Sequence, residues 1–288
     1  MHCLGLKYFN KNQVLSILEK AIYFKNNTNY TKSLEDAIVI NMFFENSTRT
    51  KTSFEIAALK LGAKVVNFDY AKSSLQKGEN WVDTITNLNA MHPDFFVTRH
   101  SYSGFPLYIS QFTKANIINA GDGTNEHPSQ ALLDLMTMYE HTKDIEDLKV
   151  CIIGDIVNSR VARSHMYLAK MFNWDLSFYG PTTFLPQNFE GIKIEKNLEQ
   201  ATSNKDIVIL LRIQLERKSG VNIPSLAEYN KFFGIKKAIN AYIMHPGPVN
   251  RDVELDSCVY IDRNVLITKQ VENGVYVRMA IFDFCALN

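Results

Sequence analysis

A short polar run, Ser47-Thr48-Arg49-Thr50, carries the residue types that bind a dianion. The apolar run at 38–44 before it is typical of a strand buried on both faces of a parallel sheet. Apolar residues then recur at helical spacing, which predicts a helix over about 48–61. The polar run therefore lies at a helix N-terminus, where unpaired backbone N–H groups and the helix dipole attract anions. It is a candidate phosphate site, although a Ser-Thr pair alone is more typical of an ordinary helix cap.

The bulk composition requires anion binding to come from a local cluster. The chain has 288 residues, 46% apolar content and a net charge of +1. This length usually divides into two domains, and the charge excludes a general basic field for nucleic acid or an anionic membrane. The cysteines are scattered without a CxxC pair, and neither a signal-peptide profile nor an apolar run of transmembrane length occurs. We expect a cytoplasmic protein with reduced thiols.

Strand and helix patterns alternate in two series. In the first series, further strands are predicted at 65–68, 95–98 and 117–120, with helices at 81–90, 107–113 and 129–139. In the second series, strands are predicted at 149–154, 176–179, 207–211 and 242–244. We expect an α/β chain with domains at 1–139 and 140–288, each an open parallel sheet flanked by helices, and a last helix at 275–287 that packs back on the first domain.

Polar side chains follow several of the predicted strands. They are Arg99, the segment 121–130, the segment 155–160, Arg212 with Gln214, and the segment 245–248. One such Arg is usually a solvated surface residue. Loops that follow parallel strands share one edge of a sheet, however, so with Arg49 we expect four arginines and a histidine to converge on one cleft. Such a cleft suits ligands with several negative charges.

Five motifs in this order resemble the signature set of carbamoyltransferases. They are Ser47-Thr48-Arg49-Thr50, Lys77-Gly78-Glu79, His127-Pro128-Ser129-Gln130, the segment Asp155 to Arg160, and His245-Pro246-Gly247-Pro248. The match spans nearly the whole chain, and aspartate carbamoyltransferases are the most similar branch. The resemblance implies transfer of the carbamoyl group of carbamoyl phosphate to the α-amine of L-aspartate, giving N-carbamoyl-L-aspartate and phosphate in pyrimidine synthesis.

The resemblance also implies roles for residues of the donor site. Carbamoyl phosphate would be bound by Ser47, Thr48, Arg49, Thr50, Ser73, Arg99, His127, Gln130, Pro246 and Gly247. Thr50, Arg99 and His127 would donate to the carbonyl oxygen, and Gln130 with the carbonyl of Pro246 would hold the carbamoyl NH₂. Arg49, Thr50, Lys77, Arg99 and His127 form the implied catalytic set. Without the motif, His127 could equally cap the next helix and Gln130 could equally face solvent.

The two carboxylates of aspartate each require a cationic partner. The resemblance implies that Lys77, Arg160, Arg212 and Gln214 bind this substrate. Taken alone, Arg160 could instead form an ion pair within the chain, for example with Glu45. Arg212 would repel an ammonium group, and the Ser-Met-Gly loop of ornithine carbamoyltransferases does not occur in this sequence.

The polar segment 72–79 contains Ser73 and Lys77 and looks by itself like a solvated turn. In the family this loop enters the site of a neighbouring subunit, which implies a homotrimer with shared sites. A regulatory chain or a dihydroorotase partner is compatible with the sequence. No metal or other cofactor is implied, because no histidine or cysteine pair has ligand spacing.

Three other functions would each require different sequence features. An ornithine carbamoyltransferase would share the phosphate motif but not the acceptor residues. A non-catalytic carbamoyltransferase-like binding subunit would have lost charged site residues, and none of the matched positions is lost. A nucleotide-dependent dehydrogenase would need GxGxxG after the strand at 149–154, where this sequence has Gly154-Asp155-Ile156-Val157-Asn158.

Overall fold

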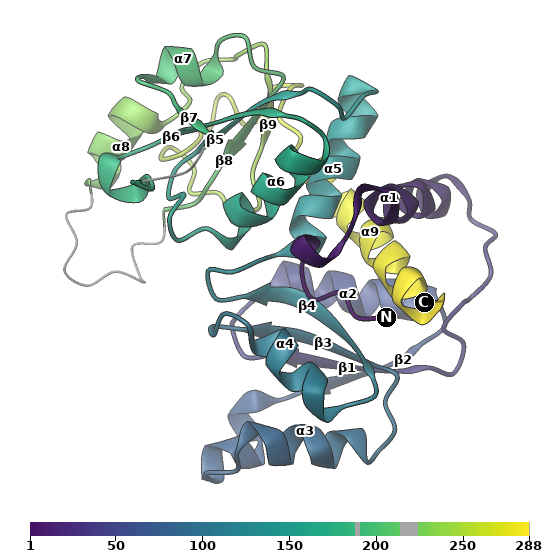
Figure 1. Cartoon of the computed structure of the whole chain (residues 1–288). Helices are drawn as coiled ribbons and strands as arrows, with labels where there is room; N and C mark the ends of the chain where they lie inside the picture. The colour runs from purple at the N-terminus through teal and green to yellow at the C-terminus, as the bar shows by residue number, and fades with distance from the viewer. Residues whose placement is uncertain (188–190, 214–223, 288) are drawn as a thin grey trace. The chain divides into compact units, whose positions relative to one another are not determined.

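The computed structural model describes residues 1–187, 191–213 and 224–287. It divides into two compact units (Figure 1). Unit 1 comprises Met1–Met136 and Val271–Asn288, and unit 2 comprises Thr137–Gln270. Each unit is an open parallel sheet flanked by helices, which confirms the predicted fold class. Within the described residues, no helix is both long and apolar enough to cross a membrane.

The sheet of unit 1 has the strand order β2-β1-β3-β4, and all its pairs are parallel. The strands are β1 (Ile38–Phe43), β2 (Lys64–Phe68), β3 (Phe95–His100) and β4 (Asn116–Asp122). Each was predicted, although β3 and β4 extend two residues further toward their carboxyl ends. Arg99 therefore lies inside β3, in register with Phe43 of β1, and not in the following loop. An apolar core that includes Met42, Phe96 and Ile117 fills one face of the sheet.

Helices cover this sheet. They are α1 (Lys11–Asn26), α2 (Thr48–Lys60), α3 (Trp81–Asn89), α4 (Phe105–Ile109), the start of α5 (Pro128–Thr142) and most of α9 (Ile267–Leu287). Short 3₁₀ turns lie at η1 (Leu6–Tyr8), η2 (Tyr70–Lys72), η3 (Ser74–Lys77) and η4 (Ser110–Phe112). Our sequence analysis missed α1. A capping box between Asn10 and Gln13, followed by buried Val14, Ile17 and Leu18, is the signal that identifies it.

Helix α9 packs on unit 1, as predicted for the end of the chain, but it begins earlier, at Ile267. The buried ring of Phe282 meets Phe54 of α2 edge-on, with ring centroids 5.9 Å apart, and meets Phe95 of β3 edge-on at 5.3 Å. Lys20 of α1 forms an ion pair of 3.1 Å with Asp283. Figure 1 shows α9 beside α1, with the two chain ends close together.

Unit 2 has the strand order β7-β6-β5-β8-β9, again all parallel. Its strands are β5 (Lys149–Ile153), β6 (Asp175–Tyr179), β7 (Lys193–Ile194), β8 (Ile207–Leu210) and β9 (Tyr242–Met244). Its helices are α6 (Arg160–Met171), α7 (Leu198–Thr202) and α8 (Leu226–Phe233), with a 3₁₀ turn at η5 (Thr182–Phe184). Cys151, Val208 and Ile243 lie in its apolar core. Strand β8 is buried along its whole length and β5 is buried after Lys149, because helices cover both faces of a parallel sheet.

We expect Phe282→Ala to destabilise the chain by about 3–5 kcal/mol, because it leaves a cavity among fully buried rings. Leu287 lies on the same helix and is 74% exposed, so Leu287→Ala serves as the control. The measurement is the free energy of unfolding in urea. Equal effects of the two substitutions would contradict the packing of α9 described above.

Candidate active site

The loop between β1 and α2 holds the predicted phosphate-binding residues. Ser47 is the N-cap residue of α2, but its side chain makes no capping hydrogen bond. Its hydroxyl is therefore not used in the way that an ordinary Ser/Thr cap would use it. Thr48 and Arg49 are exposed, whereas Thr50 is buried. The first backbone N–H groups of α2 thus accompany three hydroxyls and a guanidinium, which is the arrangement that an anion requires.

Arg99 and His127 lie together at the carboxyl end of this sheet. Nη1 of Arg99 is 3.5 Å from Nε2 of His127 and 3.3 Å from the carbonyl oxygen of Ala120. Nε of Arg99 is 3.3 Å from Oε2 of Glu45, in the loop that follows β1. The backbone N–H of Phe44 also donates to the carbonyl of Arg99. The structure therefore brings the β1–α2 loop, β3 and the segment before α5 to one place in unit 1.

Gln130 lies in the first turn of α5, just after His127, and only 7% of it is exposed. Its Nε2 donates to Oδ1 of Asp134 at 2.9 Å, in a buried hydrogen bond. The solvent-facing alternative for Gln130 is therefore wrong. Sequence analysis did not single out Asp134, although an acid one helical turn after a glutamine is a recognisable pair.

Ser73 and Lys77 lie on the segment between β2 and α3, apart from the residues above. Oγ of Ser73 donates to the carbonyl of Tyr70 at 2.8 Å, and Lys77 is exposed. In the part of the chain that the structure describes, neither side chain hydrogen-bonds to α2, β3 or α5.

Aromatic rings pack together at both ends of the loop that carries Ser73 and Lys77. Tyr70 stacks on Trp81 at 6.3 Å, and both rings meet Phe44 edge-on, at 5.2 and 4.8 Å. His100 joins the same cluster, 5.1 Å from Trp81 and 4.1 Å from Phe105. We refer to these five residues as the aromatic clamp. Because Phe44 directly precedes the anion loop, the clamp fixes the two loops relative to each other.

In unit 2, Arg160 is the first residue of α6 and is buried. The side chain of Ser159 caps this helix by accepting from the backbone N–H of Ala162 at 3.1 Å. Nδ2 of Asn158 donates to both oxygens of the buried Asp155, at 2.9 and 3.2 Å. The segment 155–160 after β5 is thus held by its own side chains, and it presents Arg160 at the carboxyl end of the sheet.

Arg212 follows β8, and Glu254 organises the backbone beside it. The buried carboxylate of Glu254 accepts from the N–H of Ile213 at 3.0 Å and from Asn250 N and Nδ2 at 2.7 and 2.9 Å. Burial raises the pKa of Glu254, and these hydrogen bonds oppose the shift. Sequence analysis missed Glu254, since nothing local links it to Ile213. Gln214, the other predicted acceptor-site residue here, lies outside the described residues.

The segment after β9 is fixed by His245. Its Nδ1 accepts from the N–H of Gly247 at 2.7 Å, and its own N–H donates to Oε1 of Gln270 at 2.9 Å. Gly247 has φ +67°, a conformation that favours glycine. These contacts define the backbone of Pro246 and Gly247, the predicted contacts for a carbamoyl group.

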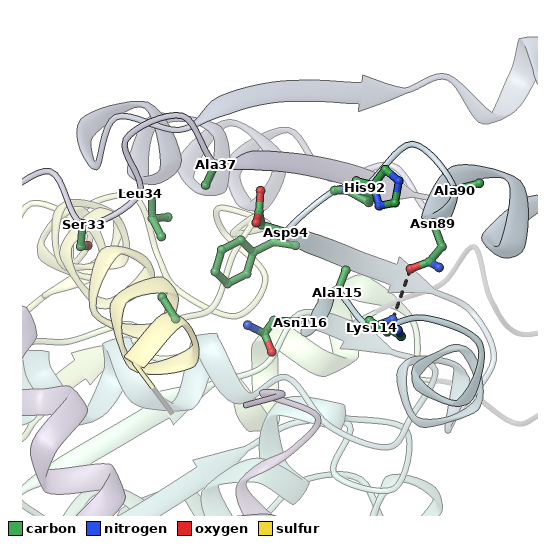
Figure 2. A pocket seen from close by; sticks show the side chains of 13 residues that line it. Ser33, Leu34, Ala37, Asn89, Ala90, His92, Asp94, Lys114, Ala115 and Asn116 are labelled. Carbon is green, nitrogen blue, oxygen red and sulfur yellow. Dashed lines mark hydrogen bonds between the residues drawn. The ribbon is translucent and has the colours of Figure 1, made fainter.

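A separate surface pocket of about 600 Å³ lies in unit 1, at the amino ends of the strands (Figure 2). It contains none of the predicted site residues. Asp94 accepts from Ile38 N at 2.8 Å, and Oδ1 of Asn89 accepts from Thr113 and Lys114. The polar side chains that line this pocket therefore hold strand ends and loops in place.

Two family models match this chain. The model of the aspartate/ornithine carbamoyltransferase carbamoyl-phosphate-binding domain matches residues 1–140, and the model of the aspartate/ornithine-binding domain matches residues 146–285. The chain belongs to the aspartate/ornithine carbamoyltransferase family. The predicted resemblance is confirmed. Among the described residues of this carbamoyltransferase, no group of three or more His, Cys, Asp or Glu is placed to hold a metal ion.

Relatives of this carbamoyltransferase point to one branch of the family. The aspartate carbamoyltransferase catalytic subunit of Campylobacter hominis is 47% identical, over 97% of this chain and 95% of its own length. That of Caldanaerobacter subterraneus is 44% identical, over 96% and 95%. Among solved structures, the catalytic subunit of M. jannaschii aspartate transcarbamoylase has a TM-score of 0.86 at 32% identity, covering 98% of this chain and 96% of its own. The Trypanosoma cruzi enzyme in complex with carbamoyl phosphate and aspartate has a TM-score of 0.85 at 26% identity, covering 98% and 94%.

The histidine in the aromatic clamp predicts a pH dependence of stability. Burial among the rings lowers the pKa of His100 to about 4, and the Glu45 carboxylate only partly opposes this. Between pH 6.5 and 4 the unfolded chain binds a proton that the native chain does not, so this residue makes stability fall as the pH falls. The expected slope is about 1.4 kcal/mol per pH unit.

The matched variants are His100→Asn and His92→Asn. The first retains an acceptor for the backbone N–H of Tyr102, which Nδ1 of His100 accepts at 2.9 Å. His92 is exposed and has φ +57°, which asparagine tolerates. Urea unfolding at pH 7 to 5, followed by tryptophan fluorescence, should show a shallower pH slope for His100→Asn only. An unchanged slope in that variant would contradict a neutral His100.

Proposed function

We propose that this chain transfers the carbamoyl group of carbamoyl phosphate to the α-amine of L-aspartate, giving N-carbamoyl-L-aspartate and phosphate. The observation that carries the proposal is the uncapped start of α2, with Arg99 and His127 grouped at the same sheet edge. The relatives named as aspartate carbamoyltransferases support the choice of acceptor.

The residues of unit 1 suit the donor. The phosphate dianion would bind the N–H groups and hydroxyls of Ser47, Thr48 and Thr50, with Arg49 and Arg99 as cationic partners. Arg99 lies 3.3 Å from Glu45, so a phosphate must compete with this carboxylate for the guanidinium. This competition favours a dianion over a monoanion.

The chemistry follows from charge development. The uncharged amine attacks the carbonyl carbon, and the carbonyl oxygen becomes an oxyanion. Thr50, Arg99 and His127 would donate to that oxygen, and each such preorganised donor is typically worth about 2.7–4 kcal/mol of barrier. The C–O bond to phosphate then breaks, phosphate leaves with the electron pair, and the departing phosphate takes the proton that the amine nitrogen loses. Gln130 with the carbonyl of Pro246 would hold the NH₂ group during the transfer.

The residues of unit 2 suit the acceptor. Arg160, Arg212 and Gln214 would bind the two carboxylates of aspartate, together with Lys77 from the loop beside the aromatic clamp. Arg212 would repel the side-chain ammonium of ornithine, which favours aspartate over the other substrate of the family. On this proposal the first domain, 1–139, binds carbamoyl phosphate, and the second, 140–288, binds aspartate.

Two substitutions test the binding of the two substrates separately. Arg212→Gln should raise KM for aspartate about 30-fold or more, since it removes a charged hydrogen-bonding group, while leaving carbamoyl phosphate binding nearly unchanged. Arg49→Gln should do the reverse. Phosphate release and carbamoylated product are measured together, with aspartate and ornithine in parallel. Product from ornithine alone would overturn the acceptor assignment, and no product from a folded chain would favour a non-catalytic subunit.

We also propose a homotrimer whose subunits share their sites. Lys77 is exposed on a loop whose two ends are held by the stacked rings of Tyr70 and Trp81. On the same unit, β2 is an edge strand with Val66 52% exposed, and Leu59 of α2 is 55% exposed. An apolar edge strand normally requires cover, and a second copy of this chain would supply it. A regulatory chain or dihydroorotase partner, a role in pyrimidine synthesis and a cytoplasmic location remain compatible with this assembly.

Complementation between subunits tests this arrangement. Lys77→Ala and Arg99→Ala subunits should each be nearly inactive. When the two are mixed and reassembled, some sites would combine an intact loop with an intact Arg99, and activity should return. Re-mixing each variant with itself is the control. No recovery in mixed trimers, verified by mass, would contradict a shared site.

A further inference from the structure

The buried pair of Gln130 and Asp134 has a consequence for substrate choice. The two residues lie one turn apart on α5, so their side chains meet on one face of the helix. Gln130 is 7% exposed and Asp134 is fully buried, and Nε2 of the amide donates to Oδ1 of the carboxylate at 2.9 Å. A buried hydrogen bond to a charged group holds its geometry firmly.

A carboxylate can only accept hydrogen bonds, whereas the two ends of an amide differ. The NH₂ end of Gln130 must therefore face Asp134, which turns Oε1 away from it. The backbone N–H of Gln130 donates to the carbonyl of His127 at 3.1 Å, so the residue belongs to the same turn as the candidate catalytic histidine. The group that Gln130 offers to a ligand is accordingly an acceptor.

Arg278 of α9 lies near Asp134 inside unit 1. It is 3% exposed, and the Asp134 carboxylate attracts its guanidinium. Nη1 of Arg278 donates to the carbonyl of Gly274 at 2.8 Å, and the guanidinium lies 4.9 Å from the ring centre of Phe54. The C-terminal helix thus places a cationic side chain close to the buried pair of Asp134 and Gln130.

We propose that Asp134 sets the orientation of the Gln130 amide and so makes the donor site selective for a carbamoyl group over an acyl group of the same shape. The proposal rests on the proposed function, in which Gln130 contacts the NH₂ of carbamoyl phosphate. Oε1 would accept from that NH₂. The methyl group of acetyl phosphate has no N–H to donate, so it would leave Oε1 without a partner. Asp134 would be a positioning residue that acts through Gln130.

The decisive variant is Asp134→Asn, whose own NH₂ can donate to Oε1 of Gln130 and reverse the amide. Calorimetric titration of the folded full chain would measure binding of carbamoyl phosphate, acetyl phosphate and inorganic phosphate. The Kd of carbamoyl phosphate should rise about tenfold or more, because two N–H groups would then face each other. The Kd values of acetyl phosphate and inorganic phosphate should change less than about twofold, since their contacts are those of the phosphate group.

A second variant retains Asp134 and tests the same claim if Asp134→Asn does not fold. Gln130→Leu removes the amide while conserving its approximate size, and it should remove the preference for carbamoyl over acetyl phosphate. The double variant should discriminate no worse than Gln130→Leu alone. An unchanged ratio of the two Kd values in either single variant would overturn the proposal. Wild-type chain that makes no carbamoyl-aspartate would instead refute the proposed function.

Discussion

The candidate site depends on one constraint, the parallel arrangement of both sheets. Parallel strands leave the sheet at the same edge, so the loops that follow them gather there. In unit 1 this brings the start of α2, Arg99 and the segment before α5 together, and in unit 2 it brings out Arg160, Arg212 and the segment 245–248. An antiparallel pairing would send alternate loops to opposite edges and separate these groups.

Carboxylates keep these cationic loops in place. Glu254 joins the segments after β8 and β9, Asp155 holds the turn before Arg160, and Asp134 holds Gln130. Each of these acids accepts from N–H donors in the same segment as, or next to, a candidate binding residue. These acids offset part of the positive charge of the arginines, in keeping with the chain's net charge of +1. Burial of such carboxylates is unfavourable without hydrogen bonds, and each of these three accepts at least one.

The aromatic clamp links the donor loop with the loop of Ser73 and Lys77. Both Tyr70 and Trp81 rest on Phe44, next to the anion loop. Packing of rings thus defines the ends of a loop whose middle is polar and exposed. Burial of His100 in this cluster lowers its pKa, which couples the stability of the fold to pH.

Local patterns identified every described strand except the two-residue β7, together with the start of α2 and the motifs of the carbamoyltransferase family, because each of these signals lies within a few neighbouring residues. The same patterns did not reveal α1, although its capping box is a local signal. They also placed the end of β3 two residues too early, so that Arg99 lies inside the strand. Several of these strands were predicted to within one or two residues, because buried apolar runs end where the polar loops begin.

The sequence by itself therefore determined the fold class, the family and most of the candidate side chains. Only the tertiary structure decided how those side chains are held. The contact of Glu254 with Ile213, that of Arg99 with Glu45 and the placement of Arg278 behind Asp134 join residues far apart in the chain. Such pairs leave no periodic signature, because they arise from the packing of separate elements and not from the spacing of residues within one.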